Sequence, residues 1–195
     1  MIVNTDMDGA RKRRRGILSR LARDRSGSTA IEFTVLALPF AALVFAILES
    51  CISFAGQQVM SNVTDEIARR LRTGQIRASD AEFTQVKLEN MVCEQLEIMV
   101  AAGCPGLHVD LRSFDTFEQA AALKIIYEGS SNETRTLASS NFTFDPGPSQ
   151  SKNVLRVFYE WPVITDYMRA KMSNLAGGKT LHFATVTWQN EPFDD

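Results

Sequence analysis

The longest uncharged stretch of this chain is also its most apolar, and it runs from Phe33 to Leu48. With its charged edges included, the apolar segment extends from about Ile31 to Phe54. An α-helix rises about 1.5 Å per residue, so this segment would be roughly 35 Å long, enough to cross a hydrocarbon core of about 30 Å. The pattern predicts a transmembrane helix over residues 28–55. A buried helix of a soluble protein is the alternative interpretation.

A helical pattern continues beyond the membrane segment. Apolar residues recur at every fourth position, at Val59, Val63, Ile67 and Leu71, and such a spacing forms one stripe along a helix. Gly74 is the expected stop at the C-terminal end. The stripe is either the face that packs on a core or a face that a partner helix covers.

A second helix is expected to begin after Ser79, a good N-cap residue that is followed three positions later by Glu82. Gly103 is expected to end it. The apolar positions between these limits are Val86, Met91, Val92, Leu96, Met99 and Val100.

The second half of the chain changes to the pattern of β-strands. Residues 107–114 alternate apolar and polar positions, and residues 153–161 and 179–189 are rich in Val, Thr and aromatic side chains. A short strand is expected within 141–148, before a Pro/Gly turn, and a helix or loop within 162–178. A long helix followed by antiparallel strands is an α+β order. We therefore expect the second helix to pack on a small antiparallel sheet.

Charge is divided unevenly along the chain. Residues 1–27 hold eight Lys or Arg and three Asp, a net charge of +5, whereas the remainder holds 13 basic and 20 acidic residues, a net charge of −7. Basic residues on one side of an apolar helix retain that side in the cytoplasm. We expect a basic cytoplasmic leader (1–27), a single transmembrane helix (28–55) and a periplasmic α+β domain (56–195). No aromatic residue is interleaved with the arginines for base stacking, so nucleic acid is not an expected partner.

Three weaker patterns would instead make the apolar segment a removable signal peptide. Ser53–Ala55 has small residues at the spacing of a signal peptidase site. Leu48–Cys51 faintly resembles a lipoprotein box, but with Glu49 in place of a small or apolar residue, and Arg14–Leu18 faintly resembles a twin-arginine signal, but with charged residues before the apolar run. A leader that long, about 55 residues, exceeds the usual 15–30, which disfavours this alternative.

The three cysteines suit an oxidising compartment. Cys93 and Cys104 lie eleven residues apart and could close a small loop worth roughly 3 kcal/mol in the unfolded chain, as a periplasmic location permits. Two unrelated thiols are the competing interpretation. Cys51, near the far end of the apolar segment, is expected to be a small buried hydrophobe or, alternatively, an intermolecular crosslink.

The sequence contains no recognisable catalytic or metal-binding set. His108 and His182 fall in predicted strands, where we expect structural roles, and no His/Cys cluster has metal-ligand spacing. There is no nucleophile elbow and no phosphate-binding loop. Asp110 and Asp115 are expected to be solvated. We therefore expect no enzymatic activity, no metal, no cofactor and no small-molecule substrate.

The carboxylate at the start of the apolar segment needs an explanation. A charged side chain in hydrocarbon costs about 2.5–3.5 kcal/mol at a helix centre and usually marks function, although Glu32 could also simply reach the headgroups. If a peptidase cut after Gly27, the new N-terminus would be Ser28, with Glu32 four residues further on. Residues at i and i+4 are neighbours on a helix, so this carboxylate could neutralise the new amine or that of a neighbouring subunit.

This arrangement resembles the class III signal of type IV pilins and pseudopilins, which has a basic leader, Gly at the cut and Glu at the fifth position of the mature chain. Further motifs narrow the resemblance to the TadE/TadG-like pseudopilins of the tight-adherence (Flp pilus) system. They include a proline within the apolar run, Pro39, and a second acid near the far end of the helix, Glu49. The other motifs are "RTGQ" (72–75), "LRVFYEWP" (155–162) and "NEPF" (190–193).

The resemblance implies a pilin-like fold, a helix kink at Pro39 and a disulfide comparable to Cys93–Cys104. It also implies cleavage between Gly27 and Ser28 by prepilin peptidase, and pairing of Glu32 with an N-terminal amine. The chain would then be a minor pseudopilin that acts in pilus assembly, surface adhesion and biofilm formation.

The same resemblance implies a place in the bacterial inner membrane, with the N-terminus in the cytoplasm and the C-terminal domain in the periplasm. The expected partners are the lipid bilayer, prepilin peptidase, other pilins or pseudopilins and the inner-membrane assembly platform. The alternatives are an uncleaved, signal-anchored periplasmic binding or adhesion module and a signal-anchored periplasmic enzyme.

Overall fold

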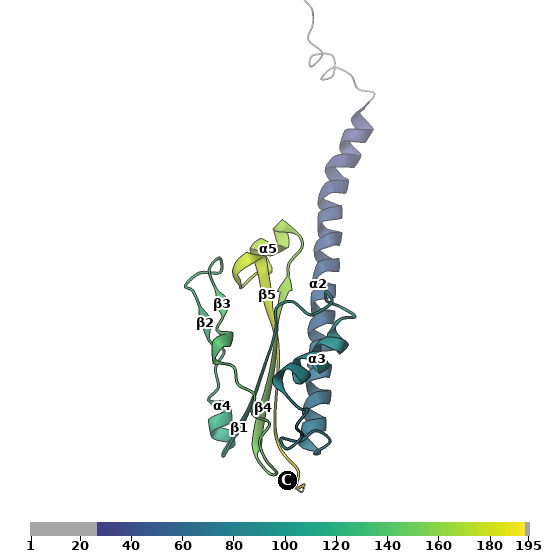
Figure 1. Cartoon of the computed structure of the whole chain (residues 1–195). Helices are drawn as coiled ribbons and strands as arrows, with labels where there is room; N and C mark the ends of the chain where they lie inside the picture. Colours follow the sequence, from purple (N-terminus) through teal and green to yellow (C-terminus); the bar gives the residue numbers. More distant parts are fainter. Residues whose placement is uncertain (1–26, 194–195) are drawn as a thin grey trace, which may run out of the picture. The chain divides into compact units, whose positions relative to one another are not determined.

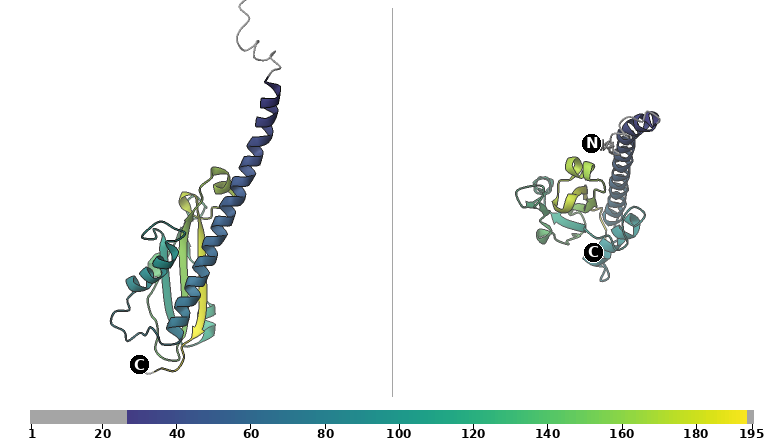
Figure 2. Two further views of the ribbon diagram at one scale, coloured as in Figure 1. Left: turned by 90° about the vertical axis from the view of Figure 1, so that its right-hand side faces the viewer. Right: turned by 90° about the horizontal axis from the view of Figure 1, so that it is seen from above.

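The computed structural model describes residues 27–193, which fold as an α+β chain (Figures 1 and 2). The elements are α2 (Ser28–Arg72), α3 (Gln85–Leu96), β1 (Leu107–Phe114), α4 (Phe117–Ala121), β2 (Tyr127–Glu128), β3 (Thr136–Leu137), the 3₁₀ turn η1 (Ser139–Asn141), β4 (Lys152–Pro162), α5 (Asp166–Met172), the 3₁₀ turn η2 (Ala176–Gly178) and β5 (Lys179–Gln189). The chain separates into two compact units between Val44 and Phe45. Residues 45–193, which belong to the second unit, are called the head. A long apolar helix, a further helix and a small antiparallel sheet confirm the predicted fold class.

The apolar stripe predicted along the C-terminal half of α2 is a core face. Val63, Ile67 and Leu71 are all buried in the largest apolar cluster of the head, and Val59 packs at its edge. Gly74 follows the helix with φ +69°, a left-handed conformation that favours glycine. The expected helix stop is therefore confirmed.

The second helix begins later than predicted. Ser79 does not cap it, because residues 77–83 form tight turns in which the Asp80 carboxylate accepts a hydrogen bond from the Arg77 N–H at 2.9 Å. Phe83 at the end of these turns is buried, with its ring 5.1 Å from that of Phe144. The cap is Thr84, whose side chain accepts from the backbone N–H of Lys87, and the helix ends at Leu96 rather than Gly103. Its buried face consists of Leu88, Val92 and Leu96.

The three predicted long strands form one antiparallel sheet in the order β1-β4-β5. Its register places Val109 opposite Val157, and Val157 opposite Ala184. Because side chains alternate along a strand, every second residue faces α2 and α3, which cover the same side of the sheet (Figure 2). The buried residues on this face are Val109, Leu111, Leu155, Val157, Tyr159, Trp161, Ala184 and Trp188.

The other face of the sheet holds a buried ion pair, which corrects the prediction that Asp110 is solvated. Asp110 is fully buried and lies opposite Arg156 in the register, and the Arg156 guanidinium donates to its carboxylate at 2.9 Å. Arg112 donates to the same carboxylate at 2.9 Å, and so does the backbone N–H of Thr143 at 2.8 Å. The pair is hidden because the segment between β1 and β4 folds over it.

That segment, residues 115–151, contains α4, the β2–β3 hairpin and η1 (Figure 1). The strand predicted within 141–148 does not form: only Phe144 makes an isolated bridge, to Leu111. Pro146 and Pro148 have no N–H to donate, which prevents a longer ladder. Residues 162–178, where either a helix or a loop is expected, contain α5 and η2 joined by irregular backbone.

Candidate functional site

The predicted processing site lies at the start of α2. Gly27 occupies a turn, helix α2 begins at Ser28, and the Ile31 N–H donates to the Gly27 carbonyl at 3.1 Å. Glu32 is exposed in the first turns of this helix. The interval from Ser28 to Glu32 is therefore helical, as the i, i+4 relationship requires. Residues 1–26 of the predicted leader lie outside the described residues.

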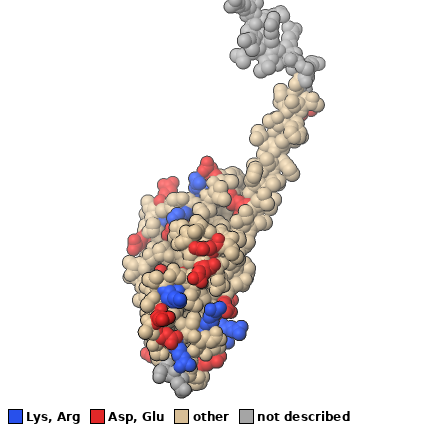
Figure 3. Space-filling view, turned by 45° about the vertical axis from the view of Figure 1, so that its right-hand side comes forward, with Lys and Arg blue, Asp and Glu red and all other residues tan. Residues whose placement is uncertain are grey.

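The next part of α2 carries a continuous apolar surface. Among the described residues, α2 is the one helix long and apolar enough to cross a membrane, and no part of its most apolar 18-residue stretch is buried. The visible surface of this stretch is almost free of charged side chains in Figure 3. The Thr34 and Ser50 hydroxyls donate to carbonyls four residues earlier, those of Ala30 and Ala46, at 2.8 Å each. These polar groups are thus satisfied within the helix, as an apolar medium demands. The large exposed side chains are Ile31, Phe33, Val35, Leu36, Leu38, Phe40, Leu43, Val44, Phe45, Ile47 and Leu48.

Pro39 lies inside α2, which continues on both sides of it. Its ring nitrogen cannot donate to the carbonyl of Val35, the ordinary partner four residues earlier. The kink expected at Pro39 stays a prediction.

Glu49 follows the uncharged stretch and, within the head, connects α2 to the residues before α5. Its side chain is buried, and its carboxylate accepts hydrogen bonds from the backbone N–H groups of Ile164 and Thr165 and from the Thr165 hydroxyl. Thr165 is in turn the N-cap of α5, since its side-chain oxygen accepts from the Met168 N–H. One carboxylate therefore satisfies the backbone where the chain leaves β4 and enters α5.

One turn further along α2, Ser53 contacts a buried histidine. The Ser53 hydroxyl and His182 Nε2 lie 3.0 Å apart, and the His182 ring stacks on Trp161 with 5.0 Å between ring centroids. Burial lowers the pKa of His182 to about 4, so this histidine is neutral at pH 7. Gly56 lies against Trp161 so closely that an added Cβ would come within 2.4 Å of the indole ring. This glycine lets helix and sheet approach.

The other histidine lies in a surface ion-pair network. His108 Nε2 is 3.9 Å from a Glu160 oxygen, and the second Glu160 oxygen accepts from Lys179 Nζ at 2.7 Å. His108 and His182 are thus on separate faces of the sheet, and each has a structural partner.

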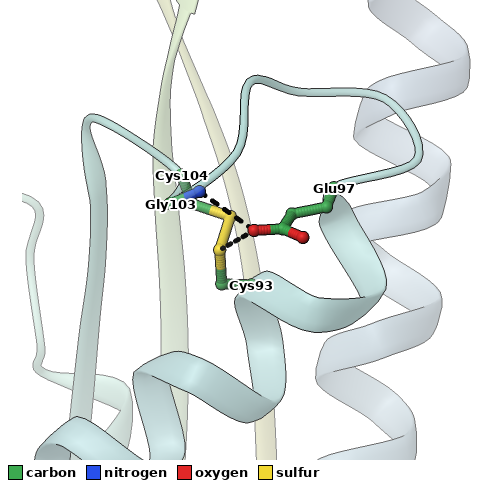
Figure 4. Close-up of a disulfide and its surroundings, with 4 residues drawn as sticks. All are labelled: Cys93, Glu97, Gly103 and Cys104. Carbon is green, nitrogen blue, oxygen red and sulfur yellow. Dashed lines mark hydrogen bonds between the residues drawn. A yellow bond between two sulfur atoms is a disulfide. The ribbon is translucent and has the colours of Figure 1, made fainter.

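Cys93 and Cys104 form a disulfide that ties the end of α3 to the start of β1 (Figure 4). Between them, the Glu97 carboxylate accepts from the Gly103 N–H at 2.9 Å. Ligand atoms of Cys93, Glu97 and Cys104 lie within 4.8 Å of one another, but thiolates, not bonded sulfurs, bind metals. The group is therefore not a metal site while the disulfide is intact. Cys51 is exposed on α2, which corrects the expectation that it is buried.

The sequence did not reveal the partners of Glu49, Ser53 and Gly56. These three residues are spaced four and three positions apart, which puts them on one face of α2. This shared face of small and acidic side chains was the signal in the sequence that could have indicated a contact surface. What they contact is more than a hundred residues away.

The family model described as "TadE-like protein" matches residues 27–69. The match begins at the predicted cut, covers the apolar stretch and includes Glu49, Ser53 and Gly56. It confirms the TadE-like resemblance over this segment. No curated protein and no solved structure matches the chain.

Proposed function

We propose that this chain is a TadE-like minor pseudopilin of a tight-adherence pilus system. Three features that occur together at the start of the family match support the proposal. Gly27 immediately precedes a helix, Glu32 lies one turn into it, and an uncharged apolar surface follows.

In this proposal prepilin peptidase hydrolyses the peptide bond between Gly27 and Ser28. Water adds across the bond, so Gly27 gains a carboxylate and Ser28 an α-amino group. A protonated amine at a helix N-terminus is unfavourable because it adds to the positive end of the helix dipole. Glu32, at i+4, offsets this charge in its own chain or in a neighbouring subunit.

The apolar surface of α2 makes first a membrane anchor and then a packing surface. It holds the chain in the inner membrane as a single span, with the basic leader in the cytoplasm and the head in the periplasm. Helices of other pilins or pseudopilins replace the lipid during assembly at the inner-membrane platform. The head, with its disulfide, makes the lateral contacts that serve surface adhesion and biofilm formation. The proposal assigns it no catalytic role.

A second candidate function is an uncleaved, signal-anchored binding or adhesion module. The observation in its favour is a groove of about 480 Å³ beside α2, lined by residues that include Ile52, Tyr159 and Trp161. Aromatic and aliphatic linings of this size suit a ligand. Co-purification with pilus components supports the pseudopilin and counts against this alternative.

A Glu32→Gln substitution tests the proposed role of the carboxylate. We expect normal membrane insertion but a loss of pilus output, because the amide cannot neutralise the amine. Glu66→Gln is the matched control, since Glu66 is another partly exposed carboxylate on α2 and pairs with Arg70 at 2.9 Å. Normal pilus output from the Glu32 variant would overturn the pairing.

A further inference from the structure

Two of the most exposed apolar side chains in the head lie within four residues of each other. Ile164 is 74% and Tyr167 is 70% exposed, although the adjoining Val163 is buried. Both belong to the segment 163–172, which leaves β4 and forms α5. Neighbouring exposed apolar side chains of this kind are a candidate interaction surface, which the surroundings of the segment then have to identify.

The segment lies level with the end of the uncharged stretch of α2. Glu49 accepts from the N–H groups of Ile164 and Thr165, and Leu48, directly before Glu49, is the last residue of that stretch. Figures 1 and 2 show α5 beside α2 at the end of the head opposite the C-terminal residues. If the uncharged stretch occupies hydrocarbon, α5 lies at the level of the lipid headgroups.

The chemistry of the segment suits that depth. Tyr167 and Lys171 are four residues apart, which puts them on one side of α5, and Ile164 lies directly before the N-cap residue Thr165. Tyrosine is enriched at membrane interfaces because its ring is apolar and its hydroxyl is polar. Asp166 is neutralised by Arg169 at 2.8 Å. Lys171 makes no ion pair among the described residues and leaves a positive charge to meet anionic headgroups.

We propose that residues 163–172 form an interfacial foot, which rests on the outer surface of the same bilayer that α2 crosses. The foot inserts Ile164 and Tyr167 between lipid headgroups, and Glu49 holds it at the correct height on α2. This inference rests on the membrane anchoring in the proposed function. Its consequence is that the head has a fixed orientation on the membrane before a pilus takes it up.

Depth-dependent quenching tests the foot in the full chain. The protein carries Cys51→Ser, keeps its disulfide and receives one new cysteine labelled with nitrobenzoxadiazole, at Tyr167→Cys or, independently, Lys171→Cys. It is reconstituted in phosphatidylethanolamine and phosphatidylglycerol vesicles that contain lipid with a nitroxide near the top of the acyl chain. Ile47→Cys is the control for insertion of α2. Val86→Cys, an exposed apolar site on α3, is the control for the rest of the head.

We expect labels at 167 and 171 to be quenched at least half as strongly as the label at 47, with no quenching at 86. Quenching at 47 but not at 167 and 171 overturns the foot and leaves the membrane anchor intact. Shielding at 167 that depends on protein density rather than on the nitroxide overturns it in favour of contact with a second copy. Equal quenching at 86 overturns it as unspecific adsorption. Absence of quenching at 47 overturns the anchor itself.

Discussion

Glu49 accepts hydrogen bonds from the backbone N–H of Thr165, 116 residues further along the chain, at 3.2 and 3.3 Å. The acid at the far end of the apolar stretch is therefore a structural link between α2 and the β4–β5 connection. A carboxylate placed there can serve the folded head in addition to any role at the membrane surface.

Substitution of this acid tests the link. Glu49→Gln removes the charge that strengthens the hydrogen bonds from three donor groups, the Ile164 N–H, the Thr165 N–H and the Thr165 hydroxyl. We expect the local stability of this segment to fall by about 1.5 kcal/mol. Amide hydrogen exchange of residues 164–168, measured by mass spectrometry on the full chain in detergent, should accelerate roughly tenfold. Glu66→Gln should leave these amides unchanged. Equal exchange in wild type and Glu49→Gln would show that the carboxylate does not hold the segment.

Gly56 and Trp161 set the distance between α2 and the sheet. Gly56→Ala forces a Cβ against the indole ring, and overpacking of this kind costs about 1–3 kcal/mol. Chemical unfolding should show this loss in the free energy of unfolding. In a Trp161→Leu background the same alanine should cost much less, because the ring that it meets is gone. Additive effects of the two substitutions would contradict the contact.

His182 makes the stability of the head depend on pH. Its folded pKa is about 4, below the ordinary value of 6.5, because burial disfavours the charged ring. The unfolded chain therefore takes up the proton first as the pH falls. The stabilisation of the fold that depends on a neutral His182 is complete above pH 6.5 and is lost progressively towards pH 4. The total loss in the free energy of unfolding is about 3 kcal/mol. Urea unfolding across this range should show the slope in wild type. The slope should be much weaker in His182→Gln, which keeps His108, and an unchanged slope in that variant would contradict the assignment.

Asp110 and Arg156 depend on each other. Asp110→Asn leaves the Arg156 guanidinium buried without its counter-charge, and a broken buried pair costs about 3–5 kcal/mol. Thermal or urea unfolding of the head should show this loss. Asp166→Asn is the matched control, because Asp166 pairs with Arg169 at an exposed surface, where an ion pair contributes about 0–1 kcal/mol. Similar losses of unfolding free energy in both variants would contradict the prediction that the buried pair stabilises the head more than the exposed pair does.

The regular elements could be predicted from the sequence because their signals are local. The four-residue repeat through Val63 and Ile67 and the alternation within 107–114 describe single faces of single elements. The cap at Thr84 was missed because Ser79 and Glu82 form an equally good local signal, and the burial of Phe83 against Phe144 decides between them.

The partners of the site residues were beyond local reasoning. In the sequence, Asp110 is simply a polar position on a predicted strand. Its partner is known only from the strand register, which places Arg156 opposite it. The contacts of Glu49 with Thr165, and of Ser53 with His182, join residues separated by 116 and 129 positions. The processing signal predicted at Gly27 and Glu32, in contrast, depends on spacing alone, so its prediction requires no knowledge of tertiary contacts.

The identity of the mature N-terminus tests the central proposal most directly. The protein is isolated from cells with an active prepilin peptidase and from a matched strain without it, and its terminal peptide is identified by mass spectrometry. The account predicts chains that begin at Ser28 in the first strain and chains that retain residues 1–27 in the second. Chains that retain residues 1–27 in both strains would contradict it.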